Sequence, residues 1–404
     1  MTTARTIDLT DTDLFVHGDP HEVWAHLRRH EPVHWNPSAD GGFWSLTKYA
    51  DVHDVYLDPS TFSSEQGTVM GGSFGSAQDS ATGQMLICAD PPEHRLLRQQ
   101  VKQGFATRML EVIGESVRRY ATRALDRITA AGGGDFAVEV APELPAGVLA
   151  AMFGLSTEDA HHLLALTRNM IGSEDGEYRD GEYRDGELAL VSAQVELFDF
   201  LGELADERRD RPGDDLVSML LSSCVNGRPM SDAEILYNSL NVVVGGNETT
   251  PYTACAGVAA FAEFPDQADR FYTDPSVLPT ALDEILRWTS TNAYVQRTAT
   301  RDTTVRGVAI AEGDKLTLWN ASANRDEDVF SSADRFDVTR TPNHHIAFGV
   351  GNHRCIGQTV ARQEITILFE LLRDRGLRFE LDGPIERLRS NFMLGTKHMP
   401  VRVV

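Results

Sequence analysis

One short stretch near the C-terminus constrains this chain more than any other. Residues 348–357 read Phe-Gly-Val-Gly-Asn-His-Arg-Cys-Ile-Gly, a single cysteine in a loop spaced by glycines. Glycines tolerate positive φ and let backbone or a flat ring pass close by. After Cys355 apolar residues recur at helical spacing: Ile365, Leu368, Phe369 and Leu372. Free N–H groups at a helix start favour a thiolate, so we expect Cys355 to face a flat iron cofactor. The alternative is a buried cysteine in a tight turn, which explains neither the glycines nor His353.

Size and composition predict a globular intracellular protein. The 404 residues contain 41% hydrophobic and 24% charged side chains, which excludes wholesale disorder. No low-complexity linker divides the chain, so we interpret residues 1–404 as one domain. Four cysteines, Cys88, Cys224, Cys255 and Cys355, are scattered without a CxxC pair, which is typical of a reduced compartment.

Charge and hydropathy argue against nucleic acid and membrane. The net charge is −23, and an acidic surface has no basic footprint for phosphates or anionic lipids. The N-terminus is polar, and no apolar run approaches the roughly 20 residues that span a bilayer. We therefore expect a soluble, cytoplasmic protein, and a monomer.

The patterning along the chain predicts a mainly α fold with a small β-rich part. Helical periodicity dominates a body at about residues 91–290, and short β-like pieces occupy about 33–50 and 297–320. Residues 173–187 hold the tandem repeat Gly-Glu-Tyr-Arg-Asp and seven acidic side chains, so we expect a solvated loop between helices. Two interpretations stay open for it: a lid over a binding site, or a neutral duplication in a tolerant loop.

A second motif lies within a long predicted helix near residues 231–264. Its centre reads Gly245-Gly246-Asn247-Glu248-Thr249-Thr250-Pro251. Each interior glycine costs about 1 kcal/mol relative to alanine, and an interior proline costs more. Such a run predicts a deliberate kink with freed carbonyl groups.

Together these two motifs resemble the cytochrome P450 family, the haem-thiolate monooxygenases. The loop matches all six specified positions of Phe-Gly-x-Gly-x-His-x-Cys-x-Gly, and the helix matches Ala/Gly-Gly-x-Asp/Glu-Thr-Thr, with Gly245 where alanine is commoner. The resemblance covers about residues 19–400 and implies a triangular helical prism around haem b. It makes Cys355 the axial iron ligand, with Phe348, Gly349 and Gly357 in the cofactor loop. It also implies that Gly245 and Gly246 make room for dioxygen, that Thr249 holds a water, and that Glu248 relays protons.

Further matches imply residues that anchor the haem and stabilise the fold. The stretch Asp-Pro-Pro-Glu-His-Arg-Leu-Leu-Arg at 90–98 resembles the family's Asp-Pro-Pro-x-His-x-x-x-Arg. By this resemblance the propionates bind His94, Arg98, Arg297 and His353. Glu284 and Arg287 resemble the ExxR pair, and with Arg335 they would form a structural ionic network.

Oxygen activation requires an electron source, and the resemblance implies NAD(P)H, a ferredoxin reductase and a ferredoxin. Residues 93–108 carry four cations and one acid, a local net charge of +3 in a chain of −23. With Arg354 they could form a docking patch for an acidic ferredoxin. The alternative is that they are propionate contacts and ordinary surface charges.

The same resemblance places the substrate pocket, without identifying the substrate. The expected pocket residues are Asn241, Val243, Val244, Ala293, Val295, Phe392 and Leu394. They suggest a sizeable hydrophobic molecule that is hydroxylated or epoxidised, such as an intermediate of secondary metabolite biosynthesis, free or bound to a carrier protein. Two alternatives remain: a haem-thiolate enzyme of other chemistry, such as oxidative coupling or peroxide-driven oxidation, and a non-enzymatic haem sensor.

Overall fold

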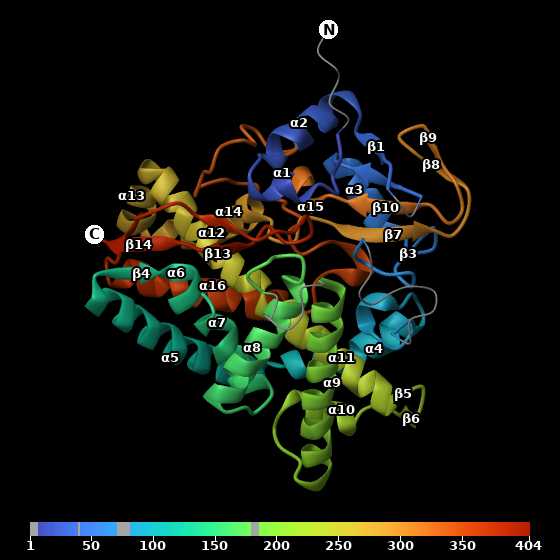
Figure 1. Cartoon of the computed structure of the whole chain (residues 1–404), viewed down its shortest axis with the longest axis horizontal. Coiled ribbons are helices and arrows are strands. Elements are labelled where there is room, and N and C mark those ends of the chain that lie inside the picture. Colours follow the sequence, from blue (N-terminus) through green and yellow to red (C-terminus); the bar gives the residue numbers. More distant parts are fainter. Residues whose placement is uncertain (1–6, 39–40, 71–80, 179–185) are drawn as a thin grey trace.

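Helices form most of the molecule, and short strands form small sheets at several places around them (Figure 1). The computed structural model describes residues 7–38, 41–70, 81–178 and 186–404. The α-helices are α1 Thr12–Val16, α2 Pro20–His30, α3 Tyr49–Leu57, α4 Glu93–Val101, α5 Thr107–Ala131, α6 Phe136–Glu139, α7 Glu143–Met152, α8 Thr157–Ile171, α9 Gly186–Asp210, α10 Leu216–Leu221, α11 Asp232–Asn247, α12 Thr249–Glu263, α13 Pro265–Thr273, α14 Leu278–Thr289, α15 Asn320–Ala323 and α16 Gln358–Asp374. Short 3-10 turns are η1 Leu86–Cys88, η2 Lys102–Phe105, η3 Pro275–Val277 and η4 Gly351–His353. The prediction of a mainly helical fold is confirmed.

The strands are short; β1, β2 and β7 to β10 lie in or beside the two predicted β-rich stretches, and the other strands lie elsewhere in the chain. They are β1 Val33–Asn36, β2 Phe43–Leu46, β3 Phe62–Ser63, β4 Gly133–Asp135, β5 Cys224–Val225, β6 Arg228–Pro229, β7 Val295–Ala299, β8 Thr303–Val305, β9 Val308–Ile310, β10 Lys315–Leu318, β11 Phe379–Leu381, β12 Glu386–Arg387, β13 Thr396–His398 and β14 Pro400–Val403. One sheet has the order β1-β2-β10-β7-β3, with β2 and β10 parallel and the other neighbours antiparallel. A second sheet, β11-β14-β4, joins the chain's end to the body. The remaining strands pair as hairpins: β5-β6, β8-β9 and β12-β13.

Helix ends follow local sequence chemistry. Ser231 accepts from the N–H of Glu234, whose carboxylate accepts from the N–H of Ser231, so a capping box begins α11. Ser156 caps α8 in the same way through the N–H of Asp159. At the other end, α5 stops at Gly132, whose φ of 78° is left-handed. These signals fix where the long helices start and stop before any packing occurs.

The interior brings the cysteine loop's helix against the kinked helix. Helix α16 packs on α5, α12 and α14, and Phe261 of α12 meets Phe369 of α16 edge to face at 5.6 Å. On the other side of α5, the backbone of α7 comes so close that a Cβ on Gly147 would lie 2.8 Å from Val117 Cα. Among the described residues no single helix is long and apolar enough to cross a membrane, although the bent pair Phe136–Met152 and Thr157–Ile171 (119°) meets those criteria jointly.

The predicted kink is a full break between two helices. Helix α11 ends at Asn247 and α12 begins at Thr249, with Glu248 at the junction. The Thr249 hydroxyl donates to the Gly245 carbonyl at 3.0 Å, so it takes up one of the carbonyls freed there. A Cβ on Gly245 or Gly246 would meet nothing within 4 Å, and both residues line a cavity.

The acidic segment before α9 departs from the expected solvated loop. Asp175 is only 5% exposed and is held by several hydrogen bonds. The repeat itself lies mostly outside the described residues, at 179–185. The composition of this segment predicted a solvated loop, because composition alone does not reveal hydrogen-bond partners that lie far away in the chain.

Candidate active site

The cysteine loop contains η4 and leads into α16, and its shape depends on two glycines. Gly349 and Gly351 have φ of 63° and 70°. A Cβ on Gly351 would lie 2.8 Å from the carbonyl oxygen of Tyr56, so side chains are excluded there. The N–H of Cys355 donates to the Phe348 carbonyl at 2.9 Å, which closes the loop.

The Cys355 thiol needs a cation to stay ionised. Burial raises its pKa, while the N–H groups of Gly357 and Gln358 and the charges of Arg98 and Arg354 oppose that rise. The helix start therefore helps the thiolate but does not outweigh burial. A metal ion bound to sulfur would deprotonate the thiol outright.

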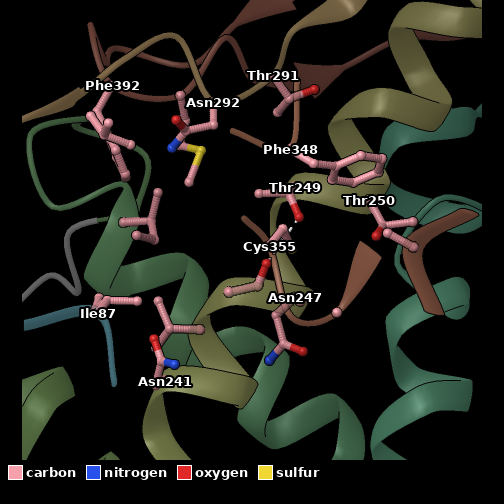
Figure 2. A pocket seen from close by; sticks show the side chains of 18 of the residues that line it. Ile87, Asn241, Asn247, Thr249, Thr250, Thr291, Asn292, Phe348, Cys355 and Phe392 are labelled. Carbon is pink, nitrogen blue, oxygen red and sulfur yellow. Dashed lines mark hydrogen bonds between the residues drawn. The ribbon is translucent and has the colours of Figure 1, made fainter. Parts of the chain in front are cut away.

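A cavity of about 520 Å³ has Cys355 and the broken helix in its wall. Figure 2 shows side chains from different elements around this pocket, with Thr249, Thr250 and Asn247 coming from the helix break and Cys355 from the loop. Phe348, Gly349 and Gly357 also line it. The structure thus brings the two sequence motifs, about 100 residues apart, to one space.

Glu248 lies outside the cavity lining, against the body of the protein. It is fully buried, and burial raises its pKa, while Arg168 lowers it. Arg168 Nε of α8 is 3.6 Å from Glu248 Oε2, and the Arg168 guanidinium lies 5.9 Å from the centre of the Tyr178 ring. The sequence analysis missed Arg168, because a single arginine on an amphipathic helix carries no local sign of an acid 80 residues away.

A second buried carboxyl, Glu364 of α16, also borders the cavity. The Thr250 hydroxyl donates to Glu364 Oε2 at 3.2 Å, while Glu364 Oε1 has no partner. Burial raises the pKa of Glu364 well above its ordinary value. The sequence did not indicate that Glu364 is buried, because a single glutamate within a helical pattern is ordinarily exposed to solvent.

The predicted anchoring cations gather on one side of the cavity, and none of them forms an ion pair with a carboxylate of the described residues. Arg297 is 4% exposed, and no carboxylate of the described residues lies within ion-pair distance of it. Its Nη1 donates to the Gln296 carbonyl, and burial lowers its pKa. Arg98 Nη2 donates to the Arg354 carbonyl at 2.5 Å, and both Arg98 and Arg297 line the cavity.

Two histidines complete this group. The rings of His94 and His353 are 4.1 Å apart, and His353 Nε2 is 3.2 Å from Ser64 Oγ. His94 is 2% exposed, and its Nε2 has no hydrogen-bond partner among the residues that the structure describes. Buried polar groups in proteins are normally paired. Unpaired cations and an orphaned imidazole nitrogen beside a cysteine-lined cavity therefore fit an iron cofactor with anionic side arms.

The predicted pocket residues divide into two groups. Asn241, Val244, Val295 and Phe392 line the cavity, whereas Val243, Ala293 and Leu394 do not. Val243 is fully buried in the core, because adjacent helix positions face about 100° apart and its neighbours Val242 and Val244 take the cavity side. Ala293 and Leu394 pack instead in the cluster around Trp319.

The cavity lining also includes Asn292, Met393 and Ile171. Figure 2 shows Asn292 and Phe392 on the side of the pocket away from the Thr250 side chain. The 291–295 segment and the 389–393 segment meet through the bridge Asn292↔Met393. Only this pairing decides which residues of each irregular segment face the cavity.

A buried ion-pair network lies behind the site, as the ExxR pair predicted. Arg287 Nε and Nη2 donate to Glu284 at 2.7 Å each, and both side chains are fully buried. Arg287 also donates to the backbone carbonyls of Asn324, Ala333 and Arg335. Every charged atom therefore has a partner.

The third member of that network is Arg340, so the prediction for the Arg335 side chain was wrong. Arg340 Nε donates to Glu284 Oε2 at 3.1 Å, and Arg340 is 8% exposed. Arg335 contributes only its carbonyl oxygen, which accepts from Arg287 and Arg340. The backbone between Arg335 and Arg340 turns and is irregular, so the sequence alone does not show which of the two side chains points inward.

The expected basic patch is partly neutralised. Arg108 pairs with Asp214 at 3.1 Å, and Arg98 faces the cavity. Arg95, Lys102 and Arg354 remain exposed.

Comparison with known proteins agrees with this geometry. A family model described as Cytochrome P450 matches residues 189–382. The chain is 36% identical over 407 residues to linalool 8-monooxygenase of Pseudomonas putida, covering 98% of each, and 33% identical over 407 residues to steroid C26-monooxygenase of Mycobacterium bovis, covering 98% of this chain and 92% of that one. Its structure superposes with a TM-score of 0.88 on Mycobacterium marinum cytochrome P450 CYP268A2 in complex with pseudoionone, at 30% identity and with 100% and 99% of the two chains covered. This chain therefore belongs to the cytochrome P450 family and is a haem-thiolate monooxygenase.

Proposed function

We propose that this monooxygenase hydroxylates or epoxidises a small, mostly apolar molecule of isoprenoid type. One observation carries the proposal: Cys355 and Thr249 line the same cavity, whose wall is otherwise largely apolar. The relatives named above act on linalool or a steroid or bind pseudoionone, and all three compounds are isoprenoid. We infer that the natural substrate is an intermediate of secondary metabolism with the same character.

The cavity wall supports a substrate with one polar end. Val244, Val295, Phe392 and Met393 supply apolar surface, while Asn292 and Asn241 supply amides on separate elements. Both side chains are partly exposed in the cavity wall, where a ligand hydroxyl or carbonyl group can pair with their amides. The expected orientation places that group near Asn292 or Asn241 and an apolar carbon toward Thr249.

The bound haem would be held through Cys355, with its propionates at Arg297, Arg98, His94 and His353. When bound, the haem would supply the iron that activates dioxygen. Burial raises the pKa of Glu248 and so favours its protonated form, while the charge of Arg168 acts in the opposite direction. The Thr249 hydroxyl, beside it in the chain, lies on the cavity surface and can pass a proton inward or hold a water there.

Electrons are proposed to come from NAD(P)H through a ferredoxin reductase and a ferredoxin. Arg95, Lys102 and Arg354 are exposed near the cysteine loop in a chain of net charge −23. An acidic ferredoxin would be steered to this local positive charge.

Replacing Thr249 tests the oxygen-activating role. In Thr249→Ala we expect NAD(P)H consumption to continue while product per NAD(P)H falls about 10-fold or more, because the proton-holding hydroxyl is lost. Linalool and pseudoionone serve as test substrates after a spin-state titration shows that they bind. Thr249→Ser should restore coupling.

Unchanged coupling in Thr249→Ala would remove the role of Thr249. It would favour the alternative of oxidative coupling or peroxide-driven chemistry, which needs no such hydroxyl. A protein that binds haem but shows no substrate-dependent electron consumption would favour the haem sensor.

A further inference from the structure

A charged cluster away from Cys355 ties two walls of the cavity together. One wall ends in residues 172–178, called here the entrance segment, of which Ser173 and Glu174 line the cavity. The other is the C-terminal hairpin region, where residues 389–393 line it. Asp175 accepts hydrogen bonds from the N–H of Arg389 at 2.9 Å and from Lys397 Nζ at 3.1 Å.

His398 of β13 adds a second connection between the entrance segment and the body of the protein, made by the two nitrogens of its ring. Nδ1 lies 2.6 Å from Asp135 Oδ2 in β4, and Nε2 lies 2.8 Å from Glu177 Oε1 in the entrance segment. Both partners are carboxylates, which only accept hydrogen bonds when ionised. A neutral imidazole carries one N–H, so only the imidazolium can satisfy both contacts.

We propose that protonated His398 is a latch that, together with Lys397, holds the entrance segment against the body of the protein, and that loss of its proton loosens this wall of the cavity. His398 is thus a positioning residue for ligand entry and retention. The proposal rests on the proposed function in one respect: the cavity is assumed to bind a substrate.

The surrounding charges favour the protonated form. Lys397 is the fixed cation of the cluster, and it pairs with Glu177 at 2.9 Å and with Asp175. The carboxylates facing the ring come from other elements: Asp135 from β4, Glu177 from the entrance segment and Glu386 from β12, the cross-strand partner of His398. From α6, Glu139 accepts from the N–H of Asp135. From α12 comes Cys255, whose pKa is raised by burial, so it adds no charge near neutral pH.

The direction of the pH dependence follows from these partners. Asp135 and Glu177 raise the pKa of His398 above its ordinary value of about 6.5. A link that needs the proton is fully present below that ordinary value and is lost as pH rises through the raised value. The latch is therefore closed in mildly acidic solution and opens on the alkaline side.

The latch also borders the buried acid of the active site. Tyr178, next to Glu177, lies against Arg168, and Arg168 is 3.6 Å from Glu248. Release of Glu177 would loosen the ring that covers Arg168. The latch thus links closure of the cavity to the surroundings of Glu248.

Two isosteric variants separate the two ring nitrogens. In His398→Asn the amide nitrogen stands near the place of Nδ1, so it keeps Asp135 and loses Glu177. In His398→Gln the amide nitrogen stands near the place of Nε2, so it keeps Glu177 and does not titrate. Hydrogen exchange of the amides of residues 172–178 is measured in the haem-loaded protein. At pH 6 the wild-type amides should be protected about 10-fold more than those of His398→Asn, and at pH 9 the two proteins should be protected equally. His398→Gln should keep the same protection, relative to His398→Asn, at both pH values.

The proposal is overturned if the ratio of wild type to His398→Asn is the same at the two pH values. Imidazole binding to the ferric haem, followed by the Soret shift at pH 7, provides a second readout. We expect it to be about 10-fold faster in His398→Asn than in His398→Gln, and equal rates would overturn the role in entry. His161→Gln, which replaces another histidine paired with a carboxylate, is the matched control and should change neither measurement. A failure of the wild-type protein to bind haem would instead count against the proposed function, whereas a pH-independent exchange ratio in protein that does bind haem counts against the latch alone.

Discussion

Arg287 and Arg297 are both buried, yet their surroundings differ completely. Arg287, behind the site, has two bonds to Glu284 and three to backbone carbonyls. Arg297, in the cavity wall, meets no carboxylate of the described chain and donates to one carbonyl of its own strand. Charges that hold the fold together find their partners within the chain, whereas charges that serve a ligand are left open for it.

The largest expected effect comes from breaking the paired region. Arg287→Ala leaves Glu284 buried without its main partner, which costs about 3–5 kcal/mol of unfolding free energy. We expect little folded protein, measured as yield and as the denaturation midpoint. Arg287→Lys should rescue only weakly, because an ammonium group cannot reproduce the forked contacts. Wild-type stability in either variant would contradict the structural role.

Arg297→Leu should behave in the opposite way. It removes a desolvated cation, so the haem-free chain should unfold within about 1 kcal/mol of wild type or be more stable. Loss of a charge-assisted hydrogen bond, about 1.5–3 kcal/mol, should speed haem transfer to apomyoglobin roughly 10- to 100-fold. Arg301→Leu, an exposed arginine near the same strand, is the control. Unchanged haem transfer would exclude Arg297 as a propionate anchor.

A smaller effect distinguishes Arg340 from Arg335. Arg340→Ala removes one bond to Glu284 and should cost about 1–3 kcal/mol. Arg335→Ala should change stability by less than about 0.5 kcal/mol, because only its backbone carbonyl is used. Paired urea titrations measure both. If Arg335→Ala lowered stability more than Arg340→Ala, the prediction that the Arg335 side chain belongs to the ionic network would be correct after all.

The features that could be predicted from the sequence depend on residues that lie only a few positions apart. The cysteine loop needs glycines at positive φ, and the ExxR pair needs one helical turn, so both are visible in neighbouring letters. The helix break is visible for the same reason, because glycines and a proline oppose a continuous helix. Arg168 and Asp175 were missed because their partners lie far away in the chain.

The sequence by itself determined the family, the break beside Thr249 and the mainly helical fold, and it predicted Cys355 as the iron ligand, because each rests on short-range chemistry. Only the tertiary structure decided that Val244 and not Val243 faces the cavity, that Arg340 and not Arg335 reaches Glu284, and that His398 joins the entrance segment to β4. The physical reason is common to all three. Which side of a helix, turn or hairpin is buried depends on the surface that packs against it, and that surface is contributed by residues remote in sequence.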